Sequence, residues 1–189
     1  HPSRLTSVGN RAFTRTSLKE VALPRSVVQI YDEAFAEMHE LTSVRLGPNV
    51  AAGQLTYGFI HSPNLVSIEV DSTNPNYASV DGVLYTKDHS HLVAFPLGKN
   101  VGGSYAVVDG TVTIDEGAFE EAKLESVTFP STLRHVGSRA FAHSSVTALS
   151  LPDAFETMGS MAFWYMPRLA RLNLGGARKV PHSAFRYNN

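Results

Sequence analysis

The chain has 189 residues, of which 43% are apolar and 17% are charged, a composition that indicates a folded rather than a disordered protein. Its formal net charge is -1 and its 16 basic residues are scattered, which argues against a nucleic acid or an anionic membrane as a partner held mainly by charge. The chain has no cysteine, which excludes disulfides and thiolate metal sites, and no apolar run approaches the roughly 18 residues that insertion across a membrane requires.

A small residue followed by phenylalanine recurs along the whole chain. From each Phe to the next, the residue number rises by 22, 24, 60, 22, 22 and 22. A fixed period of roughly 20 to 50 residues indicates a solenoid, in which each copy is one unit stacked on its neighbours. The pairs are Ala12-Phe13, Ala34-Phe35, Gly58-Phe59, Ala118-Phe119, Ala140-Phe141, Ala162-Phe163 and Ala184-Phe185.

Each copy also carries an apolar triplet with a spacing of three and then two residues. Its last two members alternate with polar neighbours, which predicts a short strand, and Pro or Gly ends most of these strands after about three to five residues. The triplets are Leu18/Val21/Leu23, Leu41/Val44/Leu46, Leu65/Ile68/Val70, Leu124/Val127/Phe129, Val146/Leu149/Leu151 and Leu169/Leu172/Leu174. Short parallel strands stacked along the solenoid are therefore predicted.

A third column stands five residues before each Phe and is apolar except at one position. Its members are Val8, Ile30, Gln54, Ile114, Val136, Met158 and Val180. We therefore expect the side opposite the strands to be buried as well. The Ala-Phe pair that follows fits a single turn of α-helix or 3₁₀-helix, with the Phe filling the core.

The longest step between anchors contains an insertion, residues 71–110. Val80–Tyr85 and Leu92–Phe95 are predicted as two strands and Lys87–His91 as their connection, which together would form a β-hairpin. Asp71–Asn76 has turn chemistry. It is only superficially similar to a calcium loop, because the glycine at its sixth place and the distal glutamate are missing.

Taken together, Leu-x-x-Val-x-Leu-Pro, the Ile/Val column and Ala-Phe at this regular step resemble the BspA-like (Treponema pallidum type) leucine-rich repeat. The resemblance covers essentially the whole chain, and Asn76–Asp88 resembles an elaborated unit that recurs in that family. One departure is the position three residues after each Phe, where the family often has cysteine. This chain has Thr16, Met38, Ser62, Ala122, Ser144 and Met166 there.

The resemblance implies a leucine-rich-repeat right-handed solenoid, with short parallel strands on one face and short turns, 3₁₀ or helical turns on the other. We expect about six coils, a coil being one circuit of the solenoid, in a single array over residues 1–189 with one β-hairpin insertion. The array is expected to be a fragment of a longer one. The resemblance also implies an extracellular or cell-surface role in adhesion and protein recognition, with no catalytic residues, metal or cofactor.

The residues that flank the middle apolar residue of each strand should face out of the stacked sheet. A flat face with little charge suits a broad protein or glycan contact, and a merely solvated face is the equal alternative. The expected ligand face comprises Glu20, Ser43, Arg45, Ser67, Glu69, Ser126, Thr128, Ser150, Arg171 and Asn173.

The insertion offers a second candidate surface through Tyr77, Tyr85, His89 and His91. The two histidines have the alternate spacing of one strand face, where they could bind a metal. The simpler interpretations are that the tyrosine rings pack the hairpin onto the solenoid and that the histidines lie at a solvated hairpin tip.

The leading functional hypothesis is a non-enzymatic recognition module of a secreted or surface-attached microbial protein, which binds a protein of a host or neighbouring cell. Two alternatives remain. One is a carbohydrate- or metal-binding site built on the insertion, and the other is a structural spacer for another domain. No Gly-x-Ser-x-Gly motif or glycine-rich phosphate loop points to an enzyme.

Overall fold

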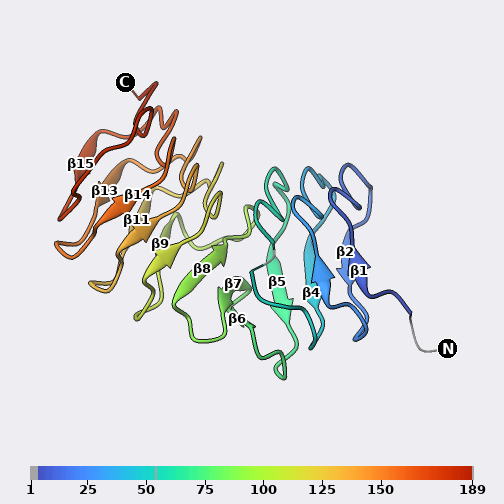
Figure 1. Cartoon of the computed structure of the whole chain (residues 1–189). Helices are drawn as coiled ribbons and strands as arrows, with labels where there is room; N and C mark the ends of the chain where they lie inside the picture. Colours follow the sequence, from blue (N-terminus) through green and yellow to red (C-terminus); the bar gives the residue numbers. More distant parts are fainter. Residues whose placement is uncertain (1–3, 54, 189) are drawn as a thin grey trace. The chain divides into compact units, whose positions relative to one another are not determined.

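The structure is a computed structural model that describes residues 4–53 and 55–188, and it is a β-solenoid of about eight coils (Figure 1). Gln54, the polar member of the predicted column, lies outside the described residues. The described residues contain short strands and turns and no helix, so none of them forms a helix able to span a membrane. Two compact units are formed: residues up to Asp88 with Val93–Lys99, and His89–Leu92 with the residues from Asn100 on. The single array over 1–189 stays a prediction.

The first unit is built on three parallel strands that coincide with the first three predicted triplets. In order they are β2 (Glu20–Ala22), β4 (Ser43–Leu46) and β5 (Ser67–Val70), and Figure 1 shows them side by side. Val44 and Ile68 lie opposite each other and are buried, as the alternation predicted. On the other side of the coil, β1 (Ser7–Val8) pairs in parallel with β3 (Gln29–Ile30) and buries the predicted column residues Val8 and Ile30.

The hairpin lies earlier in the chain than predicted. β6 (Tyr77–Val80) pairs antiparallel with β7 (Val83–Thr86), and Asp81 and Gly82 form the turn with φ angles of 49° and 77°. Two positive φ angles define the type I′ turn, for which Asp-Gly is a preferred pair. The prediction of one continuous strand over 80–85 is therefore wrong, because the tight turn falls inside that segment. The predicted pairing holds in part, since β7 and β8 (His91–Ala94) are hydrogen-bonded neighbours in one sheet.

The second unit contains two parallel ladders. On the strand side lie β9 (Ser104–Ala106), β11 (Ser126–Thr128), β13 (Ala148–Ser150) and β15 (Arg171–Asn173), in that order. On the opposite side, β10 (Thr113–Ile114), β12 (His135–Val136) and β14 (Thr157–Met158) follow the predicted column. Both sides of each coil are therefore hydrogen-bonded to the next coil, as in a solenoid built of stacked repeats.

Residues 89–110 supply a coil that the sequence period did not reveal. His91 of β8 (His91–Ala94) lies opposite Thr113, and Ser104 lies opposite Ser126, so both pairings keep the regular period of the repeat. Counting back one such period from Phe119 leads to Leu97, where the other copies have Phe. This coil, which has Phe95 but no Phe at the anchor position, is one reason why the solenoid has about eight coils rather than the six expected.

The predicted phenylalanine core is confirmed in each unit. In the first, the ring of Phe35 stacks between Phe13 at 5.4 Å and Phe59 at 5.5 Å. In the second, stacked neighbours lie 4.9 to 5.5 Å apart along Phe119, Phe141, Phe163 and Phe185. The inner rings are fully buried. Offset stacks of this kind add to the free energy gained by burying the rings.

The side that carries the Ala-Phe pairs, which we call the turn side, is made of β-turns. Short turns are thus confirmed, whereas α-helical and 3₁₀ turns are absent from the described residues. The residues two before and two after every anchor Phe have positive φ, as in Arg139 (55°) and His143 (59°). The N–H of Phe141 donates to the carbonyl of Ala162 in the next coil at 2.7 Å. Hydrogen bonds between coils therefore hold the turn side in a conformation that most residues avoid.

Candidate functional site

The strand face of the first unit places the predicted residues in two columns. Glu20, Ser43 and Ser67 lie opposite one another in register, and Arg45 lies opposite Glu69. Arg45, Glu20 and Glu69 are exposed, whereas the two serines are half-buried. The face is therefore open, and it carries one basic and two acidic side chains among small neighbours.

The strand face of the second unit continues this pattern over four strands. Thr128, Ser150 and Asn173 are exposed, and Ser150 lies opposite Asn173. Ser126 donates its hydroxyl to the hydroxyl of Ser104 at 2.8 Å, and Arg171 ends the column that runs through Ala148. The predicted ligand-face residues are thus exposed or half-buried, and the accompanying depression, which Thr128 and Ser150 help to line, is shallow.

The structure removes the two tyrosines from the predicted insertion surface. Tyr77 is 2% exposed and Tyr85 is fully buried, so these rings pack the hairpin rather than face a ligand. Their apolar rings contribute more to the free energy of folding when buried than when exposed. The packing interpretation of the two tyrosines is therefore the correct one.

The two histidines of the insertion have different surroundings. His91 contacts the carboxylate of Asp115 through its Nδ1 atom at 2.8 Å, and His89 is half-buried. Burial raises the pKa of Asp115, and the hydrogen bond from His91 opposes this shift. Within residues 4–53 and 55–188, no group of three or more His, Cys, Asp or Glu side chains could hold a metal ion.

The segment similar to a calcium loop uses Asp71 to cap its own turn, and two hydrogen bonds from Thr73 lower the pKa of that carboxyl.

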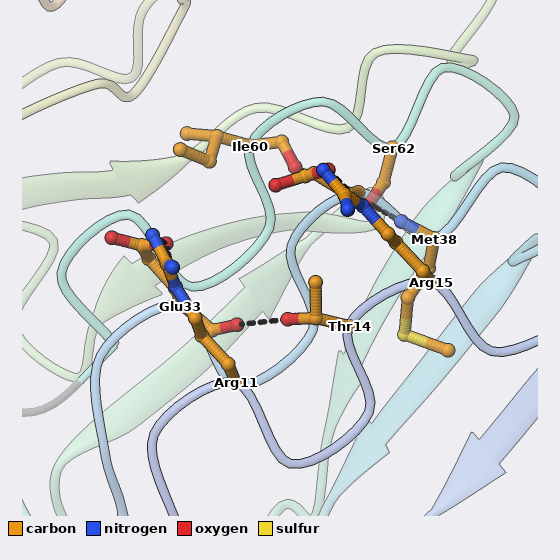
Figure 2. Close-up of polar contacts among 8 residues, drawn as sticks. Arg11, Thr14, Arg15, Glu33, Met38, Ile60 and Ser62 are labelled. Atoms are coloured by element: carbon orange, nitrogen blue, oxygen red, sulfur yellow. Dashed lines mark hydrogen bonds and ion pairs between the residues drawn. The ribbon is translucent and has the colours of Figure 1, made fainter.

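The turn side of the first unit carries ion pairs between neighbouring coils. Arg11 pairs with Glu33 at 2.6 Å, and Arg15 pairs with Glu37 at 2.6 Å. Figure 2 shows Arg11 beside Glu33, with the Thr14 hydroxyl donating to the Glu33 carbonyl. The hydrogen bond from Arg15 lowers the pKa of Glu37. Exposed pairs of this kind contribute little to stability, typically about 0 to 1 kcal/mol. The main effect of these side chains is therefore on the charge of the turn-side surface.

The position three residues after Phe links one coil to the preceding coil. Ser62 is fully buried, and its hydroxyl accepts a hydrogen bond from the Met38 N–H at 3.1 Å (Figure 2). The same hydroxyl donates to the Phe35 carbonyl at 3.0 Å. Ser144 occupies the same repeat position and is fully buried, but its hydroxyl has no hydrogen-bond partner among the described residues. The two serines therefore share a repeat position, but within the described part of the chain only the hydroxyl of Ser62 forms hydrogen bonds to the preceding coil.

We expect opposite results when each of these serines is replaced by alanine. Ser62→Ala should lower the free energy of unfolding by about 1 to 3 kcal/mol, because it leaves a buried N–H and carbonyl without their partner. Ser144→Ala should leave the free energy of unfolding unchanged or raise it, because it removes an unpaired buried hydroxyl. Urea denaturation of both variants measures the difference. Equal losses would show that the hydroxyl of Ser62 contributes nothing specific.

The sequence indicates only part of the turn side of the second unit as a candidate surface. Trp164 and Tyr165 follow an anchor Phe on the turn, where amphipathic rings often serve recognition, but the sequence reasoning did not connect them with His143 and Tyr187. The available signal was that positions two before and two after each Phe form columns, so side chains one repeat apart become neighbours. In the structure His143 lies 5.1 Å from Tyr165, ring centre to ring centre, and Trp164 lies 6.0 Å from Tyr187.

Comparison with known proteins identifies the repeat. A family model described as a BspA type leucine rich repeat region matches in six copies over residues 1–79 and 104–189. The unmatched segment contains β7 and most of the coil over 89–110, which lacks an anchor Phe. A comparison with curated proteins gives no match.

Three crystal structures are similar in fold. A leucine-rich repeat protein from Eubacterium ventriosum has a TM-score of 0.72 and 19% identity, over 95% of this chain and 60% of that one. The pneumococcal vaccine antigen PcpA has a TM-score of 0.68 and 24% identity, over 90% and 54%. A leucine-rich cell surface protein from Faecalibacterium prausnitzii has a TM-score of 0.56 and 18% identity, over 98% and 55%. This chain thus matches between 54% and 60% of the length of these proteins.

Proposed function

Because the chain belongs to the BspA-type leucine-rich repeat family, we propose that it is a non-enzymatic module that recognises a protein ligand on or outside a microbial cell. Leucine-rich repeats are protein-binding modules, and their stacked coils form the extended surfaces that such modules use. The ligand in this proposal is a protein of a host or of a neighbouring cell.

The observation that carries the proposal is the register of the strand face. Side chains at equivalent positions repeat at the spacing of neighbouring strands, about 4.8 Å, over three strands in the first unit and four in the second. Most of them are small and polar, and they line shallow depressions rather than a deep cleft. Such a face fits a broad contact with another macromolecule better than the enclosure of a small substrate.

The extracellular location draws support from two of the similar structures. One is described as a leucine-rich cell surface protein and another as a vaccine antigen. The lack of cysteine is compatible with this location but gives no positive support. The location would be tested by fractionating cells of the source and probing surface and secreted fractions with an antibody to this chain.

Binding experiments test the strand face directly. The chain is screened against immobilised fibronectin, collagen, laminin and fibrinogen, and binding is remeasured after Arg45→Glu and Arg171→Glu. Both arginines are exposed on the strand face, so we expect the double variant to bind at least tenfold more weakly. Arg25→Glu, an exposed reversal outside the strands, is the matched control.

The outcomes separate the two parts of the proposal. Equal binding by the wild-type chain and the double variant would exclude the strand face as the contact surface. A wild-type chain that binds none of these proteins, nor any protein on the surface of host cells, would contradict protein recognition itself.

A further inference from the structure

Six side chains on the turn side of the second unit form a continuous group of rings and guanidinium groups, which we call the aromatic surface. His143 packs edge-on against Trp164 at 4.7 Å, and Trp164 lies 6.1 Å from Tyr165. Arg139 stands over the Trp164 ring at 5.8 Å, and Arg186 stands over the Tyr187 ring at 4.6 Å. The aromatic surface comprises Arg139, His143, Trp164, Tyr165, Arg186 and Tyr187.

Two of these rings are exposed, whereas His143 and Trp164 are half-buried. Tyr165 is 48% exposed and Tyr187 is 55% exposed. Tyr165 lies in the coil before that of Tyr187, and its N–H donates to the carbonyl of Arg186 in that next coil. On its other side lies His143, from the preceding coil. Its exposure therefore follows from its outward direction on the turn side rather than from a place at the end of the ladder.

Charge is distributed unevenly in a way that favours an acidic partner here. All 17 acidic residues precede Thr157, and the segment 157–189 contains none. That segment contributes Arg168, Arg171, Arg178, Lys179 and Arg186. Arg139 is paired with Glu120 and is thereby neutralised, whereas Arg186 is exposed beside Tyr187. Four of the six residues of the aromatic surface thus belong to the segment without acidic residues, whose net positive charge attracts anions.

The composition of the aromatic surface is that of a protein contact. Trp, Tyr and Arg are the side chains that contribute most binding energy at protein interfaces, whereas Ser, Glu and Asp are depleted there. The strand face has the reverse composition, with serines and carboxylates at most positions. A sugar ring can stack on tyrosine as well, but the exposed rings and the exposed charge of Arg186 together match an acidic peptide segment with apolar side chains.

We propose that the aromatic surface binds an acidic, apolar-containing segment of the protein partner, with the partner's side chains on the rings of Tyr165 and Tyr187 and its carboxylates at Arg186. This inference rests on the proposed function, since it assumes that the ligand is a protein. It differs from the proposed function in placing the strongest contact with the partner on the turn side instead of the strand face.

The test uses the full chain and defined probes. A fluorescein-labelled dodecapeptide of alternating Glu with Leu and Phe is titrated by fluorescence anisotropy, beside the same peptide with Lys for Glu and a labelled hyaluronate oligosaccharide. The variant is Tyr165→Asn, Tyr187→Asn and Arg186→Glu. Asparagine is chosen because it tolerates positive φ, which both tyrosines have. Tyr31→Asn with Arg25→Glu removes a similarly exposed Tyr and reverses an Arg in the first unit, and is the control.

We expect the Glu peptide to bind at least tenfold more tightly than the Lys peptide, to weaken with added salt, and to lose at least tenfold in affinity in the triple variant but not in the control. Circular dichroism and thermal melting confirm that both variants fold. Equal binding of the two peptides, or undiminished binding by a folded triple variant, would overturn the proposal. Binding of hyaluronate in place of the Glu peptide would also overturn it and would indicate a glycan surface. Loss of protein binding only in the Arg45→Glu, Arg171→Glu variant would leave the proposed function standing and refute this inference.

Discussion

Replacing Phe141 by alanine should lower the free energy of unfolding by about 3 to 5 kcal/mol, the range measured when a buried aromatic residue of a protein core is replaced by alanine. Phe141 is fully buried, its ring stacks on Phe119 at 4.9 Å and on Phe163 at 5.5 Å, and the edge of Phe129 meets it at 5.9 Å. Its removal would leave a cavity bounded by rings that belong to neighbouring coils. Urea denaturation followed by circular dichroism measures the change.

Phe185 provides the matched control for Phe141→Ala. It stacks on Phe163 at 5.0 Å, but it is only half-buried. Phe185→Ala should therefore cost clearly less than Phe141→Ala, because less apolar surface is lost and water can fill part of the space. A loss below about 1 kcal/mol for Phe141→Ala would show that the stacked column is not what holds the coils together.

A methyl group added at Gly159 should also be strongly destabilising, by about 1 to 3 kcal/mol, because overpacking moves the backbone. A Cβ atom at Gly159 would lie closer to the backbone nitrogen of Ser138 in the preceding coil than real Cβ atoms approach. The φ angle of Gly159 is not in the left-handed region, so the effect would be steric. Thermal and urea unfolding of Gly159→Ala measure it.

Gly9 stands at the same repeat position, directly after the column residue, and a Cβ atom there would meet nothing within 4 Å. Gly9→Ala should leave stability unchanged or raise it by up to about 1 kcal/mol, since alanine restricts the unfolded chain. A similar loss in both variants would mean that glycine is needed for its backbone freedom and not for the close approach of two coils.

The features that repeat were predictable from the sequence because each is a column repeated in most or all of the copies. The phenylalanine stack and the strands of the triplets follow from the regular step alone. The coil over 89–110 was missed because Leu97 stands where the anchor Phe is expected, so the period seemed interrupted. The Asp81-Gly82 turn was a local signal that was available, but the apolar run around it favoured one continuous strand.

The candidate site was less predictable for a physical reason. Outward positions on the strands follow from a period of two, so Arg45 and Arg171 were placed correctly. Whether Tyr77 and Tyr85 are buried depends on how the hairpin packs, which no periodicity encodes. The aromatic surface arises only when side chains one repeat apart are brought side by side by turns with an unusual backbone conformation, and residue preferences alone would not predict that conformation at Tyr165 or Tyr187.

The positive φ angles of the turn side have an evolutionary consequence. Arg, Glu, Tyr, His, Met and Ser all occupy these positions, so the hydrogen bonds between coils, and not a glycine requirement, set the backbone there. Side chains at these positions can therefore be exchanged from one lineage to another without a change of fold. Lineages that keep the phenylalanine column can acquire new binding specificities simply by substitution on either side of each anchor, and a randomised library at these positions would sample the same freedom in the laboratory.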